Sequence, residues 1–247
     1  MFKGKNVCIT GCNRGIGKAL VTKFLENGAN LICCIRKLDQ EFLNYTKSIS
    51  KDNGKIIKIL EFDLEDEEKM SLGIKTLYDE KINIDILINN AGIAKGSIFE
   101  MTSIKILKKV FQINFFSQVK LIQLLLRTMK KSKNGLIINI GSVSGIKPER
   151  GNTSYGSSKA ALMFSSQILA QELKDYNIRV NSFAPTLTET DMVNEMDEKS
   201  KSSVMIARNL KRAYTADEVA EKILILASEK FKNINGKILT MENINGR

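Results

Sequence analysis

The stretch "NVCITGCNRGIG", residues 6–17, decides the fold. It begins with an apolar run at 6–10 that is typical of a buried strand, and it continues directly into Gly11, Gly15 and Gly17. The residues at 14–27 then have the amphipathic spacing of a helix. Glycines placed in this way permit a tight turn and let a helix pack closely on the strand before it. The stretch therefore predicts the first strand–turn–helix unit of an α/β fold.

The same alternation continues to the end of the chain. Short runs rich in Val, Ile and Leu predict strands at 6–10, 30–35, 55–62, 84–89, 135–141, 179–184 and 237–241. Longer amphipathic stretches predict helices at 14–27, 39–50, 66–80, 103–131, 152–175 and 216–228. Most of the predicted strands are continuously apolar, as in a parallel sheet that helices cover on both faces. We therefore expect a doubly wound, mostly parallel seven-stranded sheet, which is a Rossmann fold.

Nothing in the sequence divides the chain into domains. It has only two prolines, Pro148 and Pro185, and no linker rich in Pro, Gly or Ser. We therefore predict a single domain over residues 1–247. The least regular part is 186–214, which is polar and charged and contains scattered methionines. Because long insertions in compact domains are usually functional, we interpret it as one or two mobile helices that form a substrate lid.

Composition excludes several classes of protein. The chain has 247 residues, of which 43% are hydrophobic and 26% charged, as in an ordinary globular protein. No apolar run reaches the roughly 18 residues that a membrane-spanning helix needs. The start of the chain, "MFKGK", shows no signal peptide. These features predict a cytoplasmic protein.

The net charge of +11 raises the question of an acidic partner. Lysines are spread along the whole chain, and basic residues do not alternate with aromatic ones as in proteins that bind single strands. Solvated helix faces explain this pattern best, so we expect neither nucleic acid nor a membrane as a partner. Two dense groups could still attract an anionic substrate carrier, namely Lys105, Lys108 and Lys109 and then Arg127, Lys130 and Lys131.

The four cysteines and the absence of histidine limit the chemistry. Cys8, Cys12, Cys33 and Cys34 all lie in the first 34 residues, mostly inside apolar runs, which indicates buried thiols and not a disulfide framework. A zinc site is disfavoured because the chain has no histidine and no paired CxxC motif. We expect no metal.

The glycine loop "TGCNRGIG", residues 10–17, predicts a dinucleotide site. Its glycines let the backbone approach a pyrophosphate, and the N-terminus of the next helix supplies free N–H groups for that anion. The second strand ends in Arg36 and Lys37, with no carboxylate before Asp39, and Arg14 lies in the glycine loop. Basic residues at this point favour the 2′-phosphate of NADP(H) over NAD(H). The alternative is that Arg36 and Lys37 only start a solvated helix.

A tyrosine and a lysine in "SVSGIKPERGNTSYGSSKAAL", residues 142–162, can replace histidine in acid–base chemistry. On a helix, Tyr155 and Lys159 are i and i+4 neighbours on one face. The free phenol has a pKa of about 10, and an adjacent ammonium lowers it by stabilising the phenolate. Ser142 follows a predicted strand, at the sheet edge where ligands of open α/β sheets bind. It could hydrogen-bond a reacting carbonyl oxygen.

These residues resemble the short-chain dehydrogenase/reductase family. The resemblance rests on "TGCNRGIG", "NNAG" at 89–92, Asn114, Ser142 and "YGSSK" at 155–159, and it covers nearly the whole chain. The overall pattern is nearest to 3-oxoacyl-[acyl-carrier-protein] reductases. The resemblance implies an NADP(H)-dependent oxidoreductase that transfers a hydride between the nicotinamide and a carbonyl or secondary alcohol.

The resemblance also implies roles for individual residues. Tyr155 would donate the proton in carbonyl reduction, Lys159 would lower its pKa and bind the nicotinamide ribose, Ser142 would orient the substrate, and Asn114 would hold a water in a proton relay. The cofactor would be bound by Gly11, Asn13, Arg14, Gly15, Ile16, Gly17, Arg36, Asp63, Leu64, Asn90, Ala91, Gly92, Tyr155, Lys159, Pro185 and Thr190.

The sequence departs from the family pattern at three places and leaves alternatives open. Thr186 follows Pro185 where Gly is common, the chain ends "LTMENINGR" without the usual Gly pair, and Gln171 replaces an arginine that docks the acidic carrier. A sugar-derived or other small ketone is therefore an alternative substrate, and a non-catalytic NADP-binding regulator is an alternative class.

The resemblance further implies a homodimer or homotetramer. Family members assemble through the helices that correspond to 103–131 and 152–175. Apolar surface on these helices would come from Leu121, Leu124, Leu125, Met163, Phe164 and Ile168.

Overall fold

A computed structural model of the chain describes residues 1–132, 134–190, 193 and 198–244. Its centre is a parallel seven-stranded sheet in the order β3-β2-β1-β4-β5-β6-β7. The strands are β1 Asn6–Thr10, β2 Asn30–Ile35, β3 Ile57–Glu61, β4 Ile86–Asn89, β5 Gly135–Ile140, β6 Ile178–Ala184 and β7 Ile238–Thr240. The strand order reverses between β1 and β4. This topology confirms the predicted doubly wound sheet.

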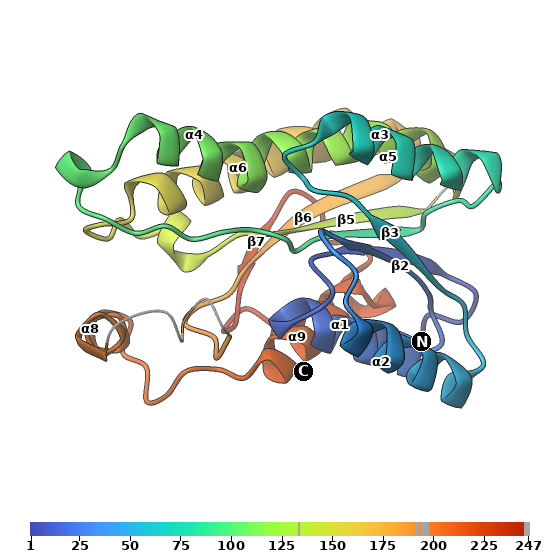
Figure 1. Ribbon diagram of the computed structural model, residues 1–247, viewed down its shortest axis with the longest axis horizontal. Coiled ribbons are helices and arrows are strands. Elements are labelled where there is room, and N and C mark those ends of the chain that lie inside the picture. The colour runs from blue at the N-terminus through green and yellow to red at the C-terminus, as the bar shows by residue number, and fades with distance from the viewer. Residues whose placement is uncertain (133, 191–192, 194–197, 245–247) are drawn as a thin grey trace.

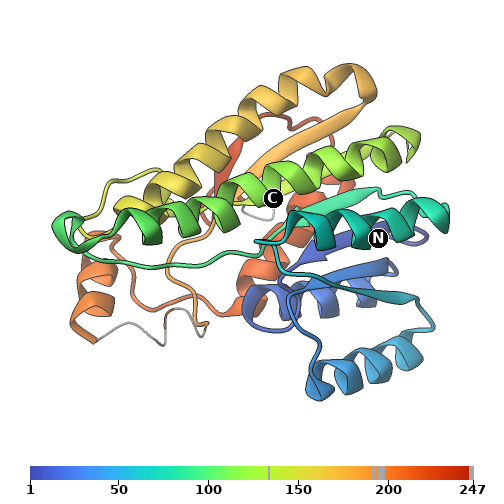
Figure 2. The same ribbon diagram turned by 45° about the horizontal axis from the view of Figure 1, so that its top comes forward.

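Helices cover both faces of the sheet (Figure 1). One layer holds α1 Gly15–Glu26, α2 Gln40–Asn53 and α9 Ala216–Ala227, and the other holds α3 Glu67–Asp79, α4 Ile104–Phe111, α5 Ser117–Ser132 and α6 Thr153–Glu172. In Figure 2, α4 and α5 follow each other end to end as one long green rod, and the yellow α6 lies beside it above the sheet. The two buried apolar clusters of the core fill the spaces between the sheet and these layers. Two strands, β1 and β2, have the bounds that the apolar pattern predicts.

The long helix predicted at 103–131 is interrupted. A π-helix, Gln112–Phe116, lies between α4 and α5 and widens the turn that carries Asn114. Alternation of apolar residues continues through this segment, so the sequence predicted a single helix. π-helical turns often occur at functional sites, where they change the direction of one side chain.

The two ends of the segment 186–214 are in contact with each other. Thr188 and Tyr214 form a parallel bridge, and the amide of Tyr214 donates to the carbonyl of Leu187 over 2.9 Å. Among the described residues between these ends is the helix α8, Glu198–Ala207, which lies at the same end of the molecule as α4 (Figure 1). Residues 191–192 and 194–197 of the predicted lid lie outside the described residues.

The structure shows which of the residues discussed from the sequence are buried and which are exposed. All four cysteines are buried free thiols, as predicted. Of the apolar residues on α5 and α6, Leu121, Leu125 and Met163 face the core, whereas Phe164 and Ile168 are exposed. The atypical C-terminal segment packs inward through Met241 and Ile244, which belong to the cluster beneath α9.

Two absences apply to the described part of the chain. None of its helices combines the length and apolar character needed to cross a bilayer. Nor do its Cys, Asp and Glu side chains gather into a group of three or more that could hold a metal ion.

The closest backbone approach in the first βα unit is at Gly17. A Cβ at this position would lie 1.9 Å from the carbonyl oxygen of Gly11, far inside van der Waals contact. Gly11 and Gly15 have φ angles of +68° and +50°, which L side chains rarely adopt. The loop therefore needs glycine both for its conformation and for the packing of α1 on β1.

We expect Gly17→Ala to lower the free energy of unfolding by about 2 kcal/mol or more, because backbone atoms must separate to admit the methyl group. Urea unfolding followed by circular dichroism measures the change. Gly96→Ala is the matched control, since its Cβ would meet only one atom, at 3.4 Å, and its φ is not positive. Equal stability of the two variants would contradict the packing argument.

Candidate active site at the carboxyl edge of the sheet

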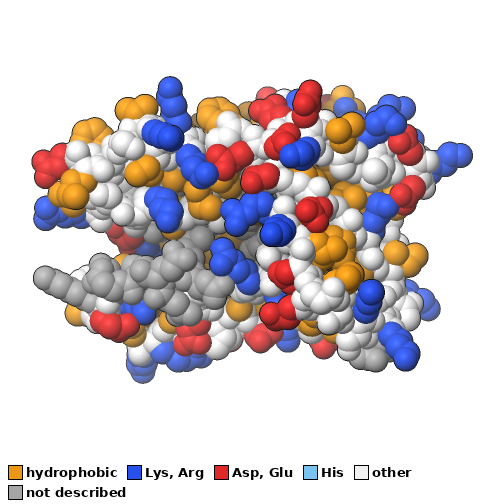
Figure 3. All heavy atoms as spheres, viewed as in Figure 1, with side chains coloured by type: hydrophobic (Ala, Val, Ile, Leu, Met, Phe, Trp, Pro, Cys, Tyr) orange, Lys and Arg blue, Asp and Glu red, His pale blue; other side chains and the backbone are white. Residues whose placement is uncertain are grey.

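A cavity of about 530 Å³ lies at the carboxyl ends of the central strands. In the space-filling view, a hollow separates the two layers at one end of the molecule, and Lys and Arg side chains lie along the middle of this face (Figure 3). The volume is within the usual range for sites that bind small molecules and cofactors. Of the predicted site residues, the cavity is lined by Gly11, Asn13, Arg14, Gly15, Ile16, Arg36, Asp63, Leu64, Asn90, Ala91, Gly92, Tyr155, Lys159, Pro185 and Thr190.

The glycine loop forms one wall of this cavity and is braced from β4. The Asn90 side chain donates to the carbonyl oxygens of Thr10, over 2.9 Å, and Gly11, over 3.2 Å. The hydroxyl of Thr10 accepts from the amides of Asn90 and Ala91. The resemblance implied only that Asn90 binds the cofactor. The structure shows that it also joins the two strands at the point where the strand order reverses.

The α1 N-terminus differs from those of its neighbours. Asp39, Asp66, Ser103 and Thr215 cap α2, α3, α4 and α9 with their side chains. The N-cap residue of α1 is Arg14, whose side chain makes no capping hydrogen bond, and the first turn holds no acidic residue. Backbone N–H groups at such a helix end attract anions.

The end of β2 supplies a basic rim to the cavity. Arg36 and Lys37 are exposed and line it together with Arg14. The first carboxylate after β2 is Asp39, which accepts the amide of Phe42 over 2.7 Å as the cap of α2. Both features fit the sequence-based prediction that this corner carries positive charge.

Lys159 has its ammonium group buried at the opposite end of the cavity. The residue is 3% exposed, and its Nζ donates to the carbonyl oxygen of Ile140 over 2.7 Å. Burial penalises the charged form and lowers the pKa of Lys159 from 10.5 to about 8. Because β5 ends at Ile140, the carboxyl edge of the sheet fixes this cation.

Tyr155 lies one helical turn before Lys159 and also lines the cavity. The Nζ of Lys159 is 5.9 Å from the centre of the phenol ring. Burial raises the pKa of Tyr155, while a hydrogen bond from Ser142 and the charge of Arg208 lower it and the charge of Glu149 raises it further. In the protein alone the pKa of Tyr155 is therefore raised, because burial of the phenol outweighs the effects that lower it, and the influence of Lys159 on this pKa stays a prediction.

Asn114 and Ser142 lie just behind the cavity surface. The Asn114 side chain accepts from the amide of Ile93 over 2.9 Å and donates to the carbonyl of Ile93 and the hydroxyl of Ser158. These bonds use most of its hydrogen-bonding capacity. A Cβ on Gly92 would be 3.1 Å from the Asn114 Oδ1 and 3.2 Å from the Lys159 Nζ, so Asn114 and Lys159 converge on Gly92.

A nicotinamide dinucleotide fits these residues. The residues that line the cavity include the basic rim at the end of β2, the start of α1 and, on α6, Tyr155 and Lys159. Gly15 and Thr190 lie close together in the cavity wall, since a Cβ on Gly15 would be 3.1 Å from the Thr190 side chain. Gly17 does not line the cavity; it acts through its contact with the Gly11 carbonyl.

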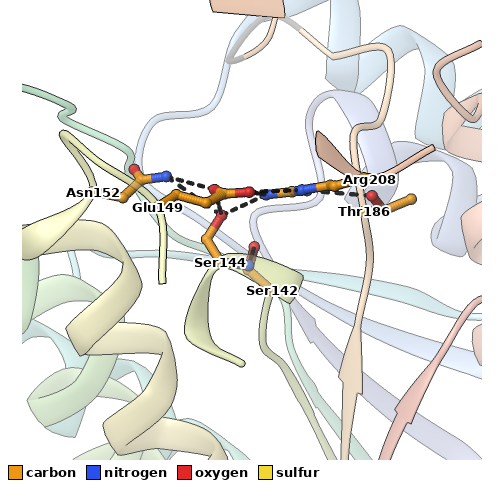
Figure 4. Close-up of polar contacts among 6 residues, drawn as sticks. All are labelled: Ser142, Ser144, Glu149, Asn152, Thr186 and Arg208. Atoms are coloured by element: carbon orange, nitrogen blue, oxygen red, sulfur yellow. Dashed lines mark hydrogen bonds and ion pairs between the residues drawn. The ribbon is translucent and has the colours of Figure 1, made fainter. Parts of the chain in front are cut away.

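Sequence reasoning missed one polar group beside the site. Arg208, which follows α8, binds Glu149, Ser144 and Thr186 (Figure 4). Glu149 and Ser144 belong to the quoted stretch around Tyr155, but 59 residues separate Glu149 from Arg208. No local sequence pattern links residues so far apart. The one signal in the sequence was the carboxylate of Glu149, which lies a few residues before Tyr155.

Comparisons with known proteins agree with this geometry. A family model described as "short chain dehydrogenase" matches residues 5–201. The chain is 32% identical over 245 residues to the 3-oxoacyl-[acyl-carrier-protein] reductase FabG of Aquifex aeolicus, covering 99% of this chain and 97% of that one. Levodione reductase superposes with a TM-score of 0.87 at 25% identity, over 97% and 96% of the two chains. The 3-oxoacyl-[acyl-carrier protein] reductase of Brucella melitensis gives 0.86 at 26% identity, over 97% and 90%.

We expect Lys159→Met to stabilise the protein by about 1 to 3 kcal/mol near neutral pH, because the fold no longer buries an ammonium. A lysine whose pKa is lower when folded costs stability below about pH 8, and the cost disappears as the pH rises towards 10.5, where the unfolded lysine is also neutral. Urea unfolding at several pH values measures this. Destabilisation at neutral pH, or a constant difference at all pH values, would contradict burial as the cause.

Proposed function

This chain belongs to the short chain dehydrogenase family, and from that premise we propose that it is an NADP(H)-dependent reductase of 3-oxoacyl thioesters. Family membership makes it an NAD(P)-dependent oxidoreductase. The choice of NADP(H) and of the thioester are proposals. The observation that carries the proposal is the placement of Tyr155 and Lys159 at one end of a cavity whose other end is basic, with Ser142 in hydrogen-bond contact with the phenol.

The acid–base step follows from the burial of two side chains. The phenol of Tyr155 is protonated at neutral pH, since burial raises a pKa that is ordinarily already well above neutrality, and a protonated phenol suits a proton donor to the oxygen of a ketone. The ammonium of Lys159, with a pKa of about 8, stays largely charged and stabilises the phenolate that remains. The hydroxyl of Ser142 bonds the phenol and orients the same oxygen. The bound dinucleotide supplies the hydride in reduction and accepts it in alcohol oxidation.

The basic rim supports NADP(H) over NAD(H). Arg14, Arg36 and Lys37 line the cavity where the second strand ends, and a 2′-phosphate would meet them there. Asp39 is already engaged as a helix cap. In the proposed complex the glycine loop and the start of α1 hold the pyrophosphate, while Asp63, Leu64 and the backbone at 90–92 surround the adenosine.

The thioester is supported by the curated relatives, several of which carry the name 3-oxoacyl-[acyl-carrier-protein] reductase. Basic residues also flank the start of α6: Lys95, Lys147 and Arg150 are exposed. The loop that carries Lys95 is joined to α6, since the hydroxyl of Ser154 donates to the carbonyl of Lys95 over 2.7 Å. An acidic carrier would be attracted to this rim.

The second basic group named from the sequence is poorly placed for a carrier. Arg127 and Lys130 lie near the end of α5, which leads into the start of β5 and so into the edge opposite the cavity. Lys130 lies 3.5 Å from the centre of the Tyr176 ring, and Arg127 lies 5.7 Å from that of Tyr78. With Gln171 in the place of the docking arginine, these contacts keep a small polar ketone as the second candidate substrate.

We also propose that 186–214 covers the substrate and that the chain forms a homo-oligomer. The ends of 186–214 are pinned together at Thr188 and Tyr214 beside the cavity. Exposed apolar side chains gather on the layer of α4 to α6, including Phe99, Met101, Ile104, Phe116, Phe164 and Ile168. Sedimentation would reveal the assembly. The cytoplasmic location and the absence of nucleic-acid and membrane partners stay predictions.

We expect Tyr155→Phe to lower kcat on acetoacetyl thioesters with NADPH by about 100-fold or more, because the proton donor is lost. Binding of NADPH should be retained, as calorimetry would show. Wild-type protein that reduces small ketones but no thioester would move the assignment to the second candidate. Wild-type protein that binds NADPH and reduces neither would indicate a regulator.

We expect the double variant Arg36→Ala/Lys37→Ala to raise the Kd of NADPH about 10-fold or more and that of NADH by less than about twofold, since only NADPH carries the 2′-phosphate. Calorimetric titration measures both constants. Lys69→Ala/Lys75→Ala also removes two charges, from α3 outside the cavity, and is the control. Equal weakening of both cofactors would contradict the proposed role of the rim.

A further inference from the structure

One arginine joins three segments of the chain beside the candidate site. The guanidinium of Arg208 donates to the Glu149 carboxylate through Nε over 2.8 Å and through Nη2 over 2.6 and 2.8 Å. It also donates to the hydroxyls of Ser144, over 2.8 Å, and Thr186, over 3.2 Å (Figure 4). Asn152 completes the group by donating to Glu149 over 2.9 Å. The other segments carry site residues: Ser144 and Glu149 lie between Ser142 and Tyr155, and Thr186 follows Pro185.

The ion pair is set apart by its burial. The side chains of Arg208 and Glu149 are 9% and 17% exposed, whereas those of the neighbouring pair Arg212 and Glu218 are 60% and 37% exposed. Exposed pairs are weak because water and salt screen them. A largely buried pair with a planar two-pronged contact has a fixed geometry, and removing one partner leaves an uncompensated charge.

Hydrogen bonds and neighbouring positions in the chain connect this group of residues to the reacting residues. Ser144 donates its amide to the hydroxyl of Ser142 over 3.2 Å. Thr186 follows Pro185, which lines the cavity and whose carbonyl accepts the amide of Val143 over 3.1 Å. Asn152 is the N-cap of α6, the helix that carries Tyr155, and its side chain binds Glu149 instead of capping the helix.

The two charges also act on the phenol directly and in opposite directions. The positive charge of Arg208 lowers the pKa of Tyr155, and the negative charge of Glu149 raises it. Within the described part of the chain, Ser142, whose hydrogen bond lowers the pKa, and Lys159, one turn along α6, also face this phenol. Removing either half of the ion pair therefore changes the environment of Tyr155 as well as the loop geometry.

We propose that Arg208 and Glu149 are positioning residues, whose buried ion pair fixes Ser144 and the start of α6 so that Ser142 and Tyr155 stay aligned for proton transfer. This inference rests on the proposed function, because it assigns the pair to the reaction at Tyr155. It also ties the residue after α8 to the loop between β5 and α6, so the segment 198–208 contributes to catalysis without touching the reacting atoms.

The test compares Arg208→Met, Arg208→Lys and Glu149→Gln with the control Arg212→Met, which removes the exposed pair. The first readout is the titration of Tyr155, taken as the ultraviolet difference between each protein and the same protein with Tyr155→Phe. Arg208→Met should raise the midpoint, Glu149→Gln should lower it, and Arg208→Lys and Arg212→Met should leave it near the wild-type value.

The second readout is kcat and KM for the ketone that the wild type reduces. Arg208→Met and Arg208→Lys should lower kcat about 10- to 100-fold with a smaller effect on KM, since lysine keeps the charge but not the two-pronged contact. The fold-loss of kcat in the double variant Arg208→Met/Glu149→Gln should be smaller than the product of the fold-losses in the two single variants. Arg212→Met should keep the wild-type kcat.

Midpoints that do not move, or that move in one direction for both Arg208→Met and Glu149→Gln, would overturn the proposal, as would an unchanged kcat in Arg208→Lys. A lower Tm with wild-type titration and kcat would show a purely structural pair and would overturn it as well. The titration needs no substrate. A wild-type protein that reduces no ketone would therefore count against the proposed function alone. The titration midpoints would still show whether the Arg208–Glu149 pair sets the environment of the Tyr155 phenol.

Discussion

The contact between Gly17 and the carbonyl oxygen of Gly11 is the constraint on which the site depends. With any side chain at Gly17, β1 and α1 would have to separate, since a Cβ would lie 1.9 Å from that oxygen. Their close packing puts the uncapped start of α1 against the carboxyl edge of the sheet. Asn90 and Thr10 brace the same loop from β4, where the strand order reverses. Cofactor-binding cavities of doubly wound sheets lie at this reversal.

Burial then gives the two titratable groups their chemistry. The chain has no histidine, and the candidate site holds Tyr155 and Lys159, whose ordinary pKa values lie well above neutrality. Burial lowers the pKa of Lys159 to about 8 and raises the pKa of the Tyr155 phenol. The carbonyl of Ile140 is the fixed acceptor for the buried ammonium. A proton donor and a cation that stabilises its conjugate base therefore lie one helical turn apart.

Local patterns in the sequence predicted the sheet and the ends of the cavity. The bounds of β1 and β2 follow from uninterrupted apolar runs, and the pairing of Tyr155 with Lys159 follows from helical spacing. The π-helix at Asn114 could not be predicted, because it changes hydrogen bonding without changing the apolar pattern. The second role of Asn90 was also hidden, since it depends on contact between β1 and β4, about 80 residues apart.

The Arg208–Glu149 pair shows the same limit, because tertiary packing alone brings the two residues together. The pKa of Tyr155 could not be predicted either, since helical spacing revealed the nearby cation and not the depth at which the phenol is buried. Sequence patterns thus predict which strands and helices carry the reacting residues. The balance between burial and charge depends on the completed fold.

The most direct test of the account is a crystal structure of the protein grown with NADP⁺. The account predicts the pyrophosphate against the backbone of 11–17 and the start of α1, the 2′-phosphate beside Arg36, and the nicotinamide end next to Tyr155 and Lys159. A cofactor bound elsewhere, or in this cavity with its 2′-phosphate away from the basic rim, would contradict it.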